Sequence, residues 1–140
     1  MEDEKIKHLE FIQLVINRMA NNSFMIKGWS ITLISGLFAL ALNANSPFTA
    51  FLPIIPTISF WVLDTYYLRQ EKLFRQLYDQ SRRAYIEKSN SFDLLNMNVE
   101  SNDKKVKSCL QLAFSRTLLL FHGIIFLLVL AGIVLFFIFK

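Results

Sequence analysis

The sequence predicts an all-α integral membrane protein with three transmembrane helices, an amphipathic N-terminal helix and a cytosolic helical stalk. Three observations predict this fold class. Hydrophobic residues make up 54% of the 140-residue chain and charged residues only 19%, which leaves too little polar cover for a small soluble domain. Two long stretches carry no charged residue. The basic residues are concentrated on one side of these stretches, as in proteins that obey the positive-inside rule.

The first two transmembrane helices are predicted from the longer uncharged stretch, residues 28–63, which is 36 residues long. Because a helix crosses a bilayer in about 20 residues, this stretch is too long for one span and long enough for a hairpin of two. Turn-forming residues occupy its middle, in the segment Asn43-Ala-Asn-Ser-Pro47. We therefore place the first span at residues 25–43 and the second at residues 48–68.

Two prolines, Pro53 and Pro56, lie inside the predicted second span. Each lacks a backbone N–H group and tends to bend a helix. A carbonyl that loses its partner in a membrane needs another donor. The hydroxyl groups of Thr49, Thr57 and Ser59 are candidates to supply it, and the alternative is a simple bend near the outer end of the span.

The third transmembrane helix is predicted at residues 117–139, which are 23 uncharged residues, enough to cross a bilayer with some tilt. Basic residues precede it, and of the 15 Lys and Arg residues all except Lys140 fall in the N-terminal segment, the stalk or the linker. The positive-inside rule then puts the N-terminus in the cytosol, and the hairpin turn and the C-terminus outside. The expected location is the bacterial inner (cytoplasmic) membrane, with multiple passes.

Two helices are predicted outside the spans. Residues 2–22 form an amphipathic helix with apolar residues at helical spacing, and the cap-type residues Asn21, Asn22 and Ser23 are expected to end it before the first span. The second span continues into a stalk helix at residues 69–88. The stalk carries an apolar stripe that we expect to pack against the N-terminal helix (Tyr67, Phe74, Leu77, Tyr78 and Tyr85). Residues 89–107 form a polar linker, as a loop or a short helix.

Four residues are expected at the cytosolic membrane interface. Lys27 and Asp64 bracket the hairpin, and Trp29 and Trp61 lie close to them in the sequence. Indole rings favour the headgroup level, and a lysine side chain can extend to the headgroups. Lys27 and Asp64 either form an ion pair or are two independent interfacial charges.

One face of the first span carries small residues, namely Gly28, Thr32, Ser35, Gly36 and Ala39. This spacing lets helices approach closely in lipid. The face packs spans of one chain or assembles several chains, and packing within one chain is the preferred interpretation. In the third span, His122 is either a polar group that faces the bundle interior or a neutral interfacial histidine, because an ionisable residue at that depth rarely faces lipid.

No catalytic or metal-binding pattern is present, so we expect no enzyme activity, no cofactor and no metal. His8 and His122 are far apart and Cys109 is the only cysteine, which also excludes an intrachain disulfide. Arg116 and His122 have a spacing seen in ribonucleases of the HEPN type, but His122 lies in an apolar span. Because the bases flank apolar stretches, we expect no binding of nucleic acid.

Two segments resemble a group of uncharacterised small bacterial membrane proteins. The first runs from His8-Leu-Glu-Phe-Ile-Gln to Lys27-Gly-Trp29, and the second runs from Phe60-Trp-Val-Leu-Asp to Gln76-Leu-Tyr78. The arrangement of a cytosolic helix, a two-span hairpin and a helical extension is also similar to that of SLATT-type membrane effectors of bacterial immune systems. That resemblance implies an effector role and assigns no catalytic residue. The third span departs from the two-span pattern.

These patterns favour an oligomeric membrane protein that perturbs the bilayer or forms a pore and is gated through its cytosolic helices. The expected partners are the lipid bilayer and further copies of the chain. A non-enzymatic anchor or accessory subunit that docks a cytosolic protein is the alternative. A transporter subunit is a third interpretation, but the chain lacks an inverted repeat.

Overall fold

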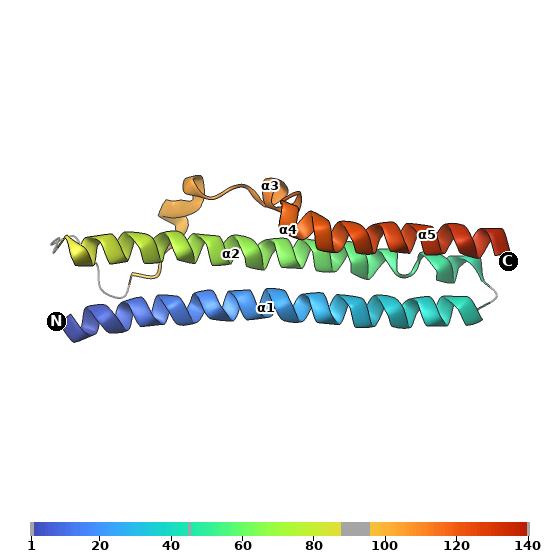
Figure 1. Ribbon diagram of the computed structural model, residues 1–140, viewed down its shortest axis with the longest axis horizontal. Coiled ribbons are helices and arrows are strands. Elements are labelled where there is room, and N and C mark those ends of the chain that lie inside the picture. Colours follow the sequence, from blue (N-terminus) through green and yellow to red (C-terminus); the bar gives the residue numbers. More distant parts are fainter. Residues whose placement is uncertain (1, 45, 88–95, 140) are drawn as a thin grey trace.

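A computed structural model describes residues 2–44, 46–87 and 96–139, and these residues form a long bundle of helices that lie side by side (Figure 1). The three main helices are α1 (Glu2–Asn43), α2 (Ile54–Ile86) and α5 (Ile124–Phe139). Shorter elements connect them: the 3₁₀ helices η1 (Pro47–Phe51) and η2 (Glu100–Lys105), the α-helices α3 (Cys109–Ala113) and α4 (Arg116–Leu118), and the π-helical turn η3 (Leu119–Gly123).

The helices α1 and α2 form an antiparallel hairpin that runs the length of the molecule (Figure 1). The N-terminus and the end of α2 lie at one end of the bundle, and the hairpin turn and the C-terminus lie at the other. The helix α5 covers only the half of α2 that is nearest to the turn. One half of the bundle therefore has three long helices and the other has two helices with the linker.

Three helical segments are long and apolar enough to cross a membrane: Asp3–Asn43, Pro47–Ile86 and Asn102–Phe139. Each contains one of the predicted spans at residues 25–43, 48–68 and 117–139. The residues that the structure describes contain no strand. The predictions of an all-helical fold and of three helices of membrane-spanning length are confirmed.

The predicted break between the N-terminal helix and the first span is wrong, because α1 continues through residues 21–23 without interruption. The reason is that two of these polar residues find side-chain partners while the helix continues. The Asn21 side chain contacts Met25 one turn later, and the Ser23 hydroxyl donates a hydrogen bond to Asp64 of α2. Cap-type residues favour helix ends only when no such partner is available.

The two prolines mark the start of α2 and do not bend its interior. Pro53 is the N-cap residue and Pro56 lies in the first turn, where a missing N–H group costs nothing. The segment before them is the 3₁₀ helix η1, so the second span is α-helical only from Ile54. The hydroxyls of Thr49, Thr57 and Ser59 donate to the carbonyls of Ser46, Pro53 and Ile55, and the Oγ1 atom of Thr57 lies 2.7 Å from the Pro53 carbonyl oxygen. The carbonyl that Pro56 leaves without an N–H partner is that of Leu52, so these bonds do not supply the donor that was predicted.

Two apolar clusters hold the helices together. In the half of the bundle with two long helices, Ile12 and Ile16 of α1 pack against Leu77 of α2, and Phe74 and Tyr78 adjoin them. This confirms that the stalk stripe packs against the N-terminal helix. In the half with three long helices, the core residues come from α1 and α5 (Ile34, Val129 and Ile133), with Phe38, Ile54 and Ile125 packed around them.

The linker is attached to α2 by polar contacts. The Gln80 side chain donates a hydrogen bond of 2.5 Å to Asn102, which is fully buried, and Arg69 pairs with Asp103 at 2.6 Å. The 3₁₀ helix η2 lies within the stretch predicted as a loop or a short helix. The last residue of the predicted stalk, Lys88, and the first part of the predicted linker, residues 89–95, lie outside the described residues.

Candidate functional site

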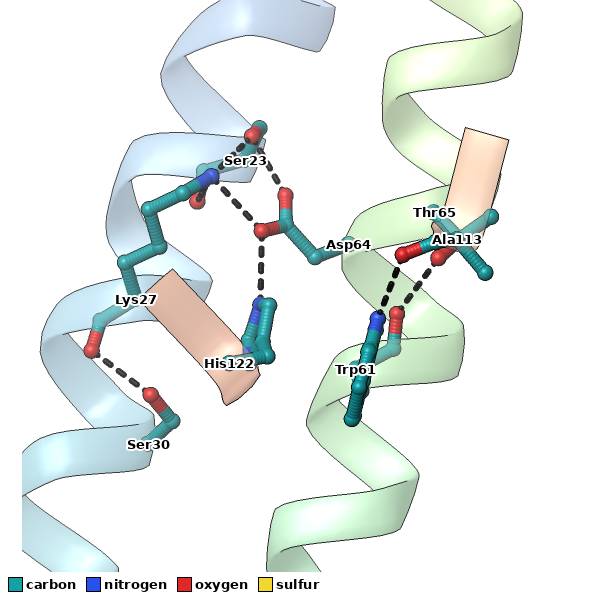
Figure 2. Close-up of polar contacts among 8 residues, drawn as sticks. All are labelled: Ser23, Lys27, Ser30, Trp61, Asp64, Thr65, Ala113 and His122. Atoms are coloured by element: carbon teal, nitrogen blue, oxygen red, sulfur yellow. Dashed lines mark hydrogen bonds and ion pairs between the residues drawn. The ribbon is translucent and has the colours of Figure 1, made fainter. Parts of the chain in front are cut away.

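The candidate site is a buried polar cluster of four side chains, Ser23, Lys27, Asp64 and His122, which we call the Asp64 cluster (Figure 2). The Oδ2 atom of Asp64 lies 2.6 Å from the Lys27 Nζ atom and 2.8 Å from the His122 Nε2 atom. Its Oδ1 atom accepts a 2.5 Å hydrogen bond from the Ser23 hydroxyl, which in turn accepts one of 2.8 Å from Lys27. Both carboxylate oxygens are therefore engaged.

Three separate parts of the chain supply the cluster. Ser23 and Lys27 are one turn apart on α1, Asp64 lies on α2, and His122 lies in the π-helical turn η3. A π-helical turn is rare and occurs frequently at functional sites. An ionised carboxylate only accepts hydrogen bonds, so His122 carries a proton on Nε2 in this contact.

Aromatic rings enclose the imidazole of His122. The Trp61 ring is stacked on it with an interplanar angle of 14° and a centroid distance of 6.0 Å, and the Phe121 ring meets it edge-on at 5.0 Å. The Lys27 ammonium group lies 5.9 Å from the centroid of the Phe121 ring, within the range of a cation–π contact. These rings therefore cover two of the partners of the carboxylate, His122 and Lys27.

The burial of Asp64 makes its partners necessary. Its side chain has no exposed surface, and the His122 side chain is 1% exposed, whereas Lys27 retains 25% exposure. An unpaired charge in such surroundings costs several kcal/mol, roughly the penalty that applies to buried ions in general. The observed packing of α1, α2 and η3 therefore gives the buried carboxylate its two partners, Lys27 and His122.

Next to the cluster, side chains donate hydrogen bonds to backbone carbonyls. The Trp61 indole N–H donates a 3.0 Å hydrogen bond to the carbonyl of Ala113, and the Thr65 hydroxyl donates to the Trp61 carbonyl at 2.8 Å (Figure 2). On α1, the fully buried Ser30 donates to the Lys27 carbonyl at 2.8 Å. The indole contact ties α2 to the segment that precedes the third span.

The structure brings together three of the residues singled out from the sequence. The Lys27–Asp64 ion pair is present, and His122 faces the interior, as one of its two interpretations predicted. Trp61 is partly buried beside them, but Trp29 is 63% exposed on the outside of α1 and takes no part in the cluster.

The small-residue face of α1 does not pack against another helix of the same chain, which corrects the preferred interpretation of that face. All five of its residues are exposed (Gly28, Thr32, Ser35, Gly36 and Ala39). A Cβ atom added at either glycine would meet nothing within 4 Å. The reason is that α1 turns another face, with Ser30, Ile34 and Ala41, toward its neighbours. Assembly of several chains through the small-residue face stays a prediction.

Two features of the cluster were not predicted. Ser23 was interpreted as a helix cap, and His122 was not paired with Asp64. Signals for both exist in the sequence: Asp64 is the only acidic residue between Glu10 and Glu71, and His122 is the only ionisable residue of residues 117–139. Ionisable groups at membrane depth generally pair with one another. The spacing of Ser23 and Lys27 by one turn becomes informative once α1 is known to be continuous.

The cluster contains one carboxylate and one imidazole, and the described residues include no group of three potential metal ligands. Arg116, the other half of the ribonuclease-type spacing, is exposed and is not among the four residues of the cluster. A scan of protein-family models, a search of curated proteins and a search of solved structures found no match to this chain. Function is therefore inferred from the sequence pattern and the geometry of this chain.

Proposed function

We propose that this chain is a multi-pass protein of the bacterial inner membrane that self-associates and permeabilises or perturbs the bilayer, under the control of its cytosolic helices. In this proposal the N-terminus, the stalk and the linker are cytosolic, and the hairpin turn and the C-terminus are outside. The chain acts without enzymatic chemistry or a cofactor. The architectural similarity to SLATT-type effectors agrees with such a role.

The observation that carries the proposal is the continuity of α1 and α2 through the level of the Asp64 cluster. With 42 and 33 residues, both helices exceed the roughly 20 residues that a bilayer requires. A displacement of their cytosolic halves is therefore transmitted into the membrane through unbroken helices. The cluster joins both helices to the third span at the same level, so a change in the cytosolic part either moves all three spans or separates Asp64 from its partners.

The surface through which copies would associate is the small-residue face of α1. It is exposed in the single chain and allows close approach of a second helix. A bulky residue there blocks the approach without affecting contacts inside the chain. The helix α5 offers a matched control, because Ala131 is exposed like Ala39 but lies outside this face.

Leakage of a dye from liposomes tests the proposal, with oligomeric mass measured by light scattering in detergent. We expect the wild-type protein to be oligomeric and to release dye. We expect Ala39→Leu to lower both signals by more than half and Ala131→Leu to leave them unchanged. A monomeric protein that releases no dye would contradict the proposal, and so would equal effects of the two variants.

The alternative function, an anchor or accessory subunit that docks a cytosolic protein, is favoured by a groove on the N-terminal half of the bundle. The groove has a volume of about 420 Å³ and is lined by α1 residues that include Phe11 and Leu14, together with Met97 of the linker. Phe11 is 56% exposed and Leu14 is 61% exposed. Under the proposed topology these apolar side chains face the cytosol.

Photocrosslinking in cells separates the two functions. A crosslinking amino acid at Leu14 reports on the groove, and one at Ala39 reports on the small-residue face. A homodimer band from Ala39 together with no adduct from Leu14 supports the membrane-perturbing function. A heterologous adduct from Leu14, without a homodimer from Ala39, supports the anchor.

A further inference from the structure

A basic cleft lies between α2 and the segment that leads into the third span. Its volume is about 420 Å³. Lys72 and Arg75 of α2 line one side, and Lys105 and Lys107 line the other. Asp79 is the only acidic residue among the described residues that line the cleft, so the four cations leave a net charge of +3 (4 − 1).

Three of these cations are the exposed residues Lys72, Lys105 and Lys107. None of the three forms an ion pair in the part of the chain that the structure describes. The fourth, Arg75, uses its Nε atom to contact Glu71 at 2.8 Å. A guanidinium group has four further N–H donors on its terminal nitrogens. The cleft therefore concentrates positive charge and hydrogen-bond donors that the chain itself does not satisfy.

A hydroxyl group at the inner end of the cleft also lacks a partner. The Oγ atom of Ser115 is buried and forms no hydrogen bond with any described residue. Buried polar atoms in folded proteins are nearly always satisfied by protein, water or ligand. Ser115 lines the cleft together with Thr117, so two hydroxyls lie at the end where the apolar third span begins.

The position of the cleft along the bundle indicates which anion could reach it. On α2 the cleft begins at Leu68, one turn beyond Asp64, and on the other side it ends at Thr117, the first residue of the uncharged span. Figure 1 shows α3 and α4 beside the middle of α2, at the place where the third span starts. This is the expected level of the lipid headgroups in the cytosolic leaflet.

Apolar side chains beside the cleft point to a lipid instead of a soluble anion. Leu110 of α3 is 75% exposed and Phe114 is 66% exposed. Such exposure on a short interfacial helix fits insertion among acyl chains. Basic pockets between membrane helices on the cytoplasmic side bind anionic headgroups in other membrane proteins.

We infer that this cleft binds the phosphate of an anionic phospholipid from the cytosolic leaflet. The phosphate lies among Lys72, Arg75, Lys105 and Lys107, beside the end of the cleft that Ser115 and Thr117 line, and the acyl chains extend along the exposed apolar surface of the third span. The inference relies on insertion in the proposed orientation, but not on permeabilisation of the membrane. It assigns the linker a role that the proposed function does not contain, which is to hold a lipid.

Native mass spectrometry of the full-length protein tests the inference. The protein is taken from nanodiscs that contain equal amounts of phosphatidylglycerol and phosphatidylcholine, and the retained lipids are counted. The variant K72Q/K105Q/K107Q removes three cations of the cleft. The control R82Q/R83Q/K104Q removes three exposed cations that do not line the cleft, and it has the same net charge.

We expect the wild-type protein to retain phosphatidylglycerol over phosphatidylcholine. Each cation near a membrane surface contributes about fivefold to anionic lipid binding, so the cleft variant loses roughly a hundredfold of this preference. The control retains most of it. Circular dichroism confirms that both variants fold, and the measurement does not depend on dye leakage, so failure of the proposed function is distinguished from failure of this inference.

Three results would overturn the inference. The first is equal retention of the two lipids by the wild-type protein. The second is an equal loss in the cleft variant and the control, since binding would then depend on net charge alone. The third is thermal stabilisation by inorganic phosphate that equals the stabilisation by phosphatidylglycerol, because the cleft would then be a site for a soluble phosphate.

Discussion

The substitution Asp64→Asn should destabilise the protein strongly, because it removes the charge that compensates Lys27. The variant keeps the shape of the side chain and its contact with Ser23, but the ion pair of 2.6 Å disappears. Removal of one partner of a fully buried pair costs about 3–5 kcal/mol. Lys27 is 25% exposed and recovers part of this by turning toward water, so we expect a loss of about 2–4 kcal/mol in the free energy of unfolding.

Unfolding by SDS in mixed micelles, followed by circular dichroism, measures this loss. A double-mutant cycle with Lys27→Met isolates the pair, and we expect a coupling energy of at least about 1.5 kcal/mol, within the range for contacting residues. The matched control is Asp3→Asn, which removes a carboxylate from the exposed Asp3–Lys7 pair and should have no measurable effect. Additive effects of Lys27→Met and Asp64→Asn, or a loss below about 1 kcal/mol for Asp64→Asn alone, would refute the assignment of the cluster as a stabilising junction.

Two further predictions concern packing and topology. A Cβ atom at Gly132 would lie 2.5 Å from the Phe38 ring, so Gly132→Leu should push α1 and α5 apart and lower the free energy of unfolding by about 1–3 kcal/mol. The neighbouring change Ala131→Leu, at an exposed position outside the small-residue face, should not, and similar losses in the two variants would contradict this packing. Cys109 is exposed, and in the proposed topology it faces the cytosol, so a membrane-impermeant maleimide should label it in inverted vesicles but not in intact spheroplasts. A Ser46→Cys change in a Cys109→Ser background should show the opposite pattern, and labelling of Cys109 from outside would reverse the orientation.

The predictions from sequence were most accurate where a single strong physical constraint acts. Long uncharged stretches can form only helices in a membrane, so the three spans and the hairpin turn followed from residues 28–63 and 117–139. The stalk stripe also followed, because a repeated apolar pattern requires a partner helix. The Lys27–Asp64 pair was one of two open alternatives, since the sequence gives the level of each charge but not the rotation of its helix.

The predictions that were wrong concern residues with more than one structural use. Asn21, Asn22 and Ser23 are typical of helix ends, but a tertiary hydrogen bond from Ser23 to Asp64 makes an interior position favourable. Small residues allow close helix packing, but nothing in their spacing says whether the partner helix belongs to the same chain. In this structure α1 turns its small-residue face outward, because its other face meets the apolar residues of α2 and α5.

The level of the Asp64 cluster follows from counts along α1 and along the third span. Lys27 lies 16 residues before the end of α1, and His122 lies 17 residues before the end of α5. At 1.5 Å per helical residue, each distance to the far end of the bundle is about 25 Å, and Asp64 lies at the same level because it contacts both residues. The hydrocarbon core is about 30 Å thick, so in the proposed topology, with the far end of the bundle at the outer boundary, the cluster would lie a few ångströms inside the cytosolic boundary.

This level explains the unequal exposure of the pair. At that depth the long Lys27 side chain can reach both the carboxylate and the headgroup region, and it is 25% exposed, whereas the short Asp64 side chain reaches no water and has no exposed surface. Deeper burial would cost both charges their hydration, and a more superficial position would weaken their attraction in water. Under the proposed function, a charged junction between three helices at this boundary would therefore respond to small displacements of the cytosolic helices.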